Sequence, residues 1–313
     1  MREQRMVPSA EFESYYGQPV IKAPTWKTPD VPAYLFLGGL AGASALLAEG
    51  AAFTGNHELE RVARVGAAVG AGLGAAALVH DLGRPERFLH MLRVFKPTSP
   101  LSVGSWVLAP FSGLSAAAAT SQLTGALPWL GRAAGVGAAA LGPALVTYTA
   151  ALLSNTAVPA WHDAYRELPF VFAGSGATAA GGFALILTHP AQAGPARRML
   201  AAGAVMELAA SETLTRRLGM VAEPYRQGRP GRLMRAARVV TAVAGGAALL
   251  AGGRSRAVSV LAGAACLAAS ASTRFGIFEA GLVSAADPKY TVVPQRERLR
   301  ARQEREAAPT IAG

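Results

Sequence analysis

The segment at 80–106 gathers side chains that can donate, accept or carry protons. It reads HDLGRPERFLHMLRVFKPTSPLSVGSW and lies between two long apolar segments. Its titratable residues alternate with aromatic and aliphatic ones. A connection between two membrane helices needs little beyond polarity, so this composition predicts a place where an amphipathic molecule, such as a quinone, meets the protein. Phe88, Leu92 and Phe95 fall at i, i+4 and i+7 of a basic stretch, which predicts an interfacial helix lying along the lipid headgroups.

A second group of chemically capable residues lies inside the apolar segments or at their edges. Ionisable side chains in lipid are costly and are usually functional or paired. Most of them fall toward the same end of the predicted spans, and only Glu49 and Glu207 lie elsewhere. This uneven distribution predicts a pocket that opens into the lipid near one face of the membrane.

Each of these residues also has a purely structural interpretation. Asp81 could pair with Arg84 or Arg87, and Arg274 could pair with Glu279. The histidine and tyrosine of the set could be ordinary hydrogen-bonded packing residues. The carboxyl groups deep in the spans could be protonated and silent, because desolvation disfavours their charged form.

Long apolar segments must position these residues. Of the 313 residues, 51% are apolar and only 16% are charged, whereas a soluble domain is nearer a quarter charged. A span needs about 20 predominantly apolar residues, and helices or closed barrels are the only structures that cross lipid. Eight segments qualify, of which the sixth and seventh are weaker, so the count could change by one: 33–54, 62–82, 102–124, 133–154, 168–188, 197–214, 236–253 and 257–283.

The sequence therefore predicts an all-α polytopic membrane protein. An N-terminal arm (1–32) precedes a transmembrane domain (33–283), and a charged tail (284–313) follows it. The glycine-rich pieces GGLAG and GSGATAAGG lie within spans, where small residues let helices approach closely, so we interpret them as packing surfaces.

The basic residues behind the formal net charge of +11 are unevenly distributed between the two sides of the predicted membrane domain. The side that carries both termini and the 82–101 loop has 21 Lys and Arg residues, against 7 on the other side. By the positive-inside rule, both termini and this loop should face the cytoplasm of a multi-pass inner-membrane protein. Topology explains the basic balance, so nucleic-acid binding is not expected.

Several cofactors are not expected in the chain. Cys266 is the only cysteine, which excludes an intrachain disulfide and a self-contained iron–sulfur cluster. The five histidines fall at span ends or in loops, so paired axial ligands for haem are not expected either.

Four blocks of sequence resemble the NrfD/PsrC family, the membrane subunits of polysulfide-reductase-type complexes. The most specific is the run from His80 to Trp106, and the others are PAYLFLGGLAGA at 32–43, YTAALLSNTAVPAWHDA at 148–164 and SAADPKYTVVPQR at 284–296. The resemblance implies two four-helix bundles and a quinone pocket. It also implies an iron–sulfur partner carrying [4Fe–4S] clusters and usually a molybdenum or tungsten catalytic subunit beyond it.

The resemblance also suggests roles for residues. His80, Asp81 and Arg84 stand in the matching block, and Tyr148 matches a tyrosine expected near the quinone head. Where some members have Asn and His at the mouth of the first helix, this chain has Val31 and Tyr34. The predicted quinone-binding residues are Tyr34, His80, Asp81, Arg84, Tyr148 and Asn155, and the predicted proton-path residues are Glu49, Glu207, Glu212, Arg274 and Glu279.

The leading hypothesis is a quinone-reactive membrane anchor that is not catalytic alone and uses menaquinone or ubiquinone as substrate. Electrons would pass between the quinone and the iron–sulfur partner, in either direction. One alternative is a proton-translocating or transport protein that works without electron transfer. Another is a purely structural anchor.

Overall fold

A computed structural model describes residues 20–307, and in this range the regular structure is helical, with no strand. The arm residues 1–19 and the tail residues 308–313 lie outside the described range. The eight long helices are α1 (Asp30–Phe53), α2 (His57–Asp81), α3 (Pro100–Thr124), α4 (Pro128–Ser154), α6 (Leu168–Leu187), α7 (Gly194–Arg217), α9 (Gly228–Ala251) and α10 (Arg256–Ala286). The shorter elements are η1 (Pro85–Leu92), α5 (Pro159–His162), η2 (Gly219–Ala222), α8 (Glu223–Arg226) and α11 (Lys289–Ala307).

Local sequence explains where the long helices begin. The side chains of Asn56, Ser99 and Ser255 each accept a hydrogen bond from a backbone N–H three residues later, which caps α2, α3 and α10. Proline stands in the first turn of α3, α4, α6 and α7, where its missing N–H is not needed.

Seven of these helices are long and apolar enough to cross a membrane, and α7 is the eighth long helix. It carries arginines near both ends and two glutamates between them, which lower its hydropathy below that of the other seven. The predicted all-α polytopic fold is confirmed. The sixth predicted span, 197–214, corresponds to α7, and its hydropathy is low, as expected.

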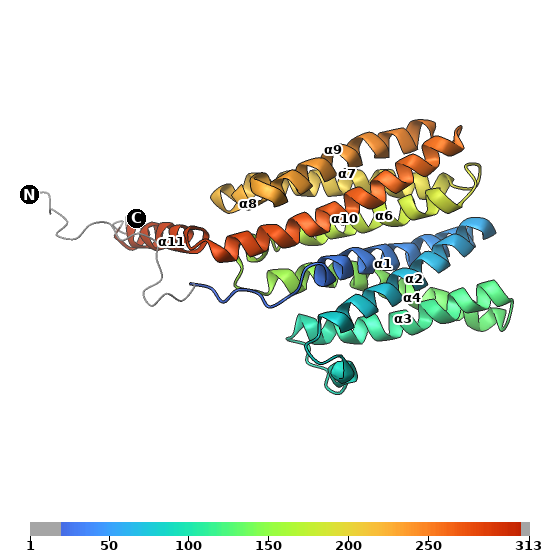
Figure 1. Ribbon diagram of the computed structural model, residues 1–313, viewed down its shortest axis with the longest axis horizontal. Coiled ribbons are helices and arrows are strands. Elements are labelled where there is room, and N and C mark those ends of the chain that lie inside the picture. The colour runs from blue at the N-terminus through green and yellow to red at the C-terminus, as the bar shows by residue number, and fades with distance from the viewer. Residues whose placement is uncertain (1–19, 308–313) are drawn as a thin grey trace, which may run out of the picture.

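The long helices form two four-helix bundles that lie side by side (Figure 1). The first bundle contains α1–α4, and the second contains α6, α7, α9 and α10. The bundles meet mainly where α1 and α4 pack against α6. The predicted division into four plus four helices is therefore present.

Glycines set the closest helix crossings in both bundles. A Cβ on Gly42 of α1 would lie 2.7 Å from the carbonyl oxygen of Gly142 in α4, and one on Gly182 of α6 would lie 2.7 Å from that of Gly263 in α10. Because no side chain separates these backbones, the helices cross in direct contact. The glycine-rich pieces of α1 and α6 are packing surfaces, as predicted.

Both ends of the described chain lie at the same end of the bundles, where α1 begins and α10 runs into α11 (Figure 1). We call this the terminal end and the other the opposite end. The indole of Trp161 in α5 stacks on Trp26 of the arm, with ring centroids 5.6 Å apart, and donates to the carbonyl oxygen of Ile277 in α10 at 2.8 Å. These contacts hold the residues just before α1 against the second bundle.

Candidate functional site

A cavity of about 430 Å³ lies at the terminal end between the start of α3 and the end of α4. Its lining combines small apolar groups with a few polar ones, from Pro97, Thr98, Pro100, Val103, Tyr148, Ala151, Ser154 and Asn155. Two residues predicted to bind a quinone, Tyr148 and Asn155, therefore share one cavity. Their hydroxyl and amide groups can donate hydrogen bonds to a carbonyl oxygen of a ligand.

Two local features shape this cavity: a glycine packed against the ring of Tyr148, and a hydrogen-bonded loop before α3. Gly104 of α3 lies against the tyrosine ring so closely that no Cβ could be added there. The loop before α3 is held by Ser102, whose hydroxyl accepts from the backbone N–H of Lys96 at 3.0 Å and donates to the carbonyl oxygen of Val94 at 3.1 Å. The rim of the cavity is thus built from fixed backbone.

A second cavity, of about 220 Å³, lies on the other side of α3 and is almost wholly apolar. Helices α2 and α3 form its walls and η1 covers it, with Phe88, Met91 and Leu92 facing inward. The short helix predicted around Phe88 and Leu92 therefore exists as η1, but it is a 3₁₀ helix that ends at Leu92, so Phe95 lies beyond it. Val103 lines the first cavity and Ser105 the second, so the first turns of α3 separate them.

His80 and Asp81 hold the N-terminal arm rather than line either cavity. The Asp81 carboxylate accepts from the backbone N–H of Lys27 at 2.9 Å, and His80 Nδ1 lies 2.9 Å from a carboxylate oxygen of Asp30. Within residues 20–307 no ion pair joins Asp81 to Arg84 or Arg87. These contacts fasten the arm to the end of α2.

The remaining two predicted quinone-binding residues lie outside both cavity linings. Arg84 is exposed just before η1. Tyr34 is buried between α1 and α2, and its hydroxyl has no hydrogen-bond partner in the described part of the chain. The structure thus divides the six residues among the cavity, the arm contacts, the loop surface and the interior.

Two of the predicted proton-path residues lie in the second bundle near its contact with α1. Glu207 of α7 accepts from the hydroxyl of Thr273 at 2.6 Å, and Arg274 is completely buried. The guanidinium of Arg274 donates to the carbonyl oxygen of Phe172 at 2.7 Å and lies 3.7 Å from the centroid of its ring. Gly39 of α1 leaves room for this guanidinium, since a Cβ there would lie 2.9 Å from Nη2.

Two other residues of the predicted path form ion pairs closer to the surface. Glu212 pairs with Arg216 at 2.7 Å and with Arg238 at 3.4 Å. Glu279 pairs with Arg229 at 3.4 Å. The alternative in which Glu279 pairs with the buried arginine of α10 is therefore wrong.

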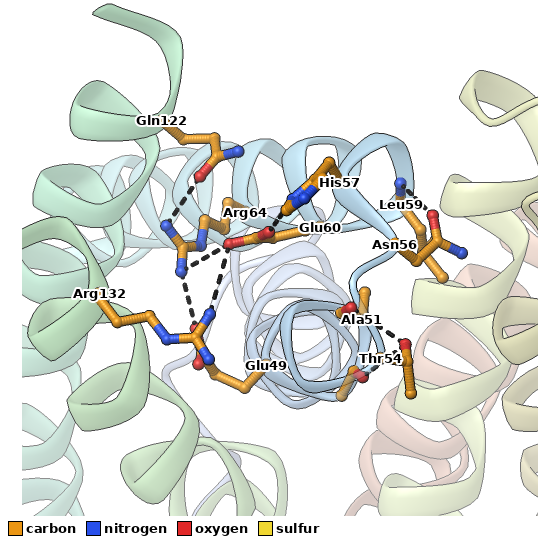
Figure 2. A network of polar contacts seen from close by, with 11 residues as sticks. Glu49, Ala51, Thr54, Asn56, His57, Leu59, Glu60, Arg64, Gln122 and Arg132 are labelled. Carbon is orange, nitrogen blue, oxygen red and sulfur yellow. Dashed lines mark hydrogen bonds and ion pairs between the residues drawn. The ribbon is translucent and has the colours of Figure 1, made fainter. Parts of the chain in front are cut away.

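Glu49, the last residue of that set, belongs to a charged network at the opposite end of the first bundle (Figure 2). Arg64 lies at its centre, 3.1 Å from Glu49 and 3.0 Å from Glu60, and it donates to the side-chain oxygen of Gln122 at 3.0 Å. Sequence reasoning counted Arg64 only among the seven basic residues of the side opposite the termini. The i, i+4 pair of Glu60 and Arg64 in a helix that turns apolar was the signal that could have found it.

Ionic contacts also fix the base of α11 at the terminal end. Glu223 accepts hydrogen bonds from Lys289 Nζ at 2.9 Å and from the hydroxyl of Tyr290 at 3.2 Å. These bonds lower the pKa of Glu223, and the same contact raises the pKa of Lys289. The tail helix therefore begins from a defined anchor.

Two comparisons with known proteins bear on the family to which the chain belongs. No curated protein matches the chain. A family model described as polysulphide reductase, NrfD, matches residues 21–200, which is more than half of the chain and includes the whole first bundle with both cavities. The chain belongs to the polysulphide reductase NrfD family and is a multi-pass membrane protein of that family.

Proposed function

We propose that the protein is the quinone-interacting membrane subunit of a multisubunit oxidoreductase. It exchanges electrons between a membrane quinone, menaquinone or ubiquinone, and a peripheral subunit that carries [4Fe–4S] clusters. A molybdenum or tungsten catalytic subunit lies beyond that partner. Family membership supports a place in a complex of the polysulphide reductase type.

The observation that carries the proposal is the cavity between α3 and α4. It is large enough for a quinone ring, it is open, and both Tyr148 and Asn155 line it. Prolines and Val103 give it apolar walls. A quinone ring has apolar faces and two carbonyl oxygens, so this lining matches its chemistry.

Reduction of a quinone consumes two electrons and two protons and gives a quinol. The partner would supply or receive the electrons, since the quinone cavity holds no residue that could carry them. Tyr148 would donate a hydrogen bond to one quinone oxygen and act as its general acid or base, and Asn155 would orient the ring. Protons would enter or leave through the open mouth of the cavity at the terminal end.

His80 and Asp81 have a different part in this proposal. Because they bind Asp30 and the backbone of Lys27, they hold the arm at the terminal end, where the clusters of the partner must approach the quinone. They act as positioning residues for the arm. A variant of Asp81 would therefore reduce assembly of the complex more than turnover per assembled complex.

The test is purification in mild detergent followed by a quinone-reduction or quinol-oxidation assay. The chain should purify with an iron–sulfur subunit, and Tyr148→Phe should lower turnover per assembled complex by about 10²-fold or more, as expected when an acid–base group is lost. Tyr165→Phe is the control, because Tyr165 is exposed and, within residues 20–307, its hydroxyl accepts a hydrogen bond from the neighbouring Arg166 alone. A chain that purified alone with full activity would contradict the proposal.

The second candidate function is proton translocation or transport without electron transfer. The buried charges of both bundles favour it. Activity that needs neither quinone nor an iron–sulfur partner would select this candidate. Normal quinone turnover in Tyr148→Phe would contradict the cavity between α3 and α4 as the quinone site.

A further inference from the structure

A very small cavity lies inside the first bundle next to the charged network at the opposite end. Its volume is about 10 Å³, close to the smallest space that holds one water molecule. Helices α1–α4 all contribute to its lining, and its polar side chains are those of Glu49, Arg64 and Ser115. A water molecule needs two to four polar partners in such a site.

The same three side chains carry buried polar atoms that bond to nothing else. Glu49 Oε2, Arg64 Nε and Ser115 Oγ have no hydrogen-bond partner within residues 20–307. Glu49 and Arg64 are each 5% exposed and Ser115 is 2% exposed, so solvent does not reach them from the surface. An unpaired buried polar group is costly, and one water can bond to all three kinds of atom.

The charges around the cavity do not balance among the buried groups. Two buried carboxyl groups, Glu49 and Glu60, face one buried guanidinium, Arg64. Glu60 also lies 4.0 Å from Arg132 of α4 and 3.4 Å from His57. Among residues 20–307, Arg64 is the ionic partner of Glu49, and one oxygen of Glu49 stays without a hydrogen bond, so Glu49 is the carboxyl group that a water in the cavity can reach.

A short route joins this site to the opposite surface. Glu49 lies four residues before the end of α1, about 6 Å along the helix axis. In Figure 2 the network runs from Glu49 through Arg64 and Glu60 to His57, whose side chain is 80% exposed. Arg64 does not give up its proton, so a proton must pass through the carboxyl groups and water.

We propose that this cavity binds one ordered water that bridges Glu49 and Ser115, and that Glu49 with this water is a proton-exchange site facing the opposite end. Glu49 takes up a proton from this water and returns a proton to it. Arg64 holds both carboxyl groups in place, and Gln122 of α3 orients Arg64. Gly135 of α4 is required because a Cβ there would overlap Glu49. The site does not depend on the chain reacting with quinone.

The experiment is infrared difference spectroscopy of the purified protein, titrated with acid, in ordinary water and in water labelled with ¹⁸O. Acidification should produce the carbonyl band of a protonated carboxyl group that is absent in Glu49→Gln. Ser115→Ala should keep this band but shift its frequency, and should abolish an O–H band that moves on ¹⁸O labelling. Ser272→Ala and Glu304→Gln are the matched controls, because Ser272 bonds only to its own helix and Glu304 is exposed on α11.

The results decide the proposal even if one variant fails to fold. A Glu49→Gln protein that lacked none of the carboxyl bands of the unchanged chain would overturn it, as would a Ser115→Ala protein whose carboxyl and ¹⁸O-sensitive bands match those of the unchanged chain. If Glu49→Gln does not yield folded protein, Ser115→Ala alone decides between the two outcomes.

Discussion

Replacement of the buried Arg274 by methionine tests how the helices of the second bundle are held together. Methionine keeps much of the volume of the side chain but removes its charge and its donors. The carbonyl oxygen of Phe172 loses a hydrogen bond of 2.7 Å, and the ring loses the guanidinium that lies 3.7 Å from its centroid. Glu207 then remains in the bundle without an opposite charge near it.

The expected loss follows from burial. Among residues 20–307 Arg274 and Glu207 form no direct ion pair, so the loss is that of a buried hydrogen bond from a charged donor, about 1.5–3 kcal/mol. Since every 1.4 kcal/mol is tenfold, the ratio of folded to unfolded protein should fall by about one to two orders of magnitude. Replacing both charges, as in Glu207→Gln with Arg274→Met, should restore part of this stability because no lone charge remains.

The assay is unfolding of the purified protein in detergent. The unchanged chain, Arg274→Met, Glu207→Gln and the double variant are compared as a double-mutant cycle. Arg229→Met is the control, because Arg229 pairs with Glu279 but its side chain is 71% exposed, and exposed pairs contribute about 0–1 kcal/mol. If Arg274→Met were as stable as this control, or if the double variant lost the sum of the two single losses, the interpretation of Arg274 and Glu207 as a coupled buried pair would be refuted.

Three further predictions concern topology, the tail and the helix crossings. A cysteine placed at Lys96 should react with a membrane-impermeant reagent only after the cytoplasmic side is opened, and labelling in intact cells would reverse the orientation. Because hydrogen bonds lower the pKa of Glu223, they stabilise the base of α11 at pH values above the ordinary carboxyl pKa of 4.5, and this stabilisation disappears as the pH falls through the lowered value. Protection of the amides at the start of α11, measured relative to their intrinsic exchange rates, should therefore decrease in acid, and Glu223→Gln should remove this dependence. Gly42→Ala should cost about 1–3 kcal/mol in thermal unfolding, since its Cβ would lie 2.7 Å from the oxygen of Gly142, whereas Gly38→Ala meets nothing within 4 Å and should cost almost nothing.

The sequence predicts the fold well because the lipid environment leaves little choice. Apolar length alone locates the long helices, with boundaries that differ from the structure by only a few residues at most ends. The larger differences lie where charged residues begin a helix. α2 starts at His57 and α9 at Gly228, before the predicted 62 and 236, because a capping side chain and tertiary packing continue a helix that hydropathy does not detect.

The candidate site is predicted less completely, because partners depend on helix rotation and on contacts between distant segments. Tyr148 and Asn155 share a cavity since they are seven residues apart, two helical turns, on one face of α4. The binding of Asp81 to the backbone of Lys27 joins residues 54 apart in the chain, and no local pattern announces it. The pairing of Glu49 with Arg64 likewise depends on how α1 and α2 face each other.

The central claim is that a quinone binds between the start of α3 and the end of α4, and photolabelling of the assembled complex tests it most directly. A photoreactive quinone analogue, competed by excess unlabelled quinone, should attach to peptides that contain residues 97–103 and 148–155, and Tyr148→Phe should weaken the labelling while Tyr165→Phe leaves it unchanged. Competed labelling confined to α7 and α10, with none at 97–103 or 148–155, would contradict the account.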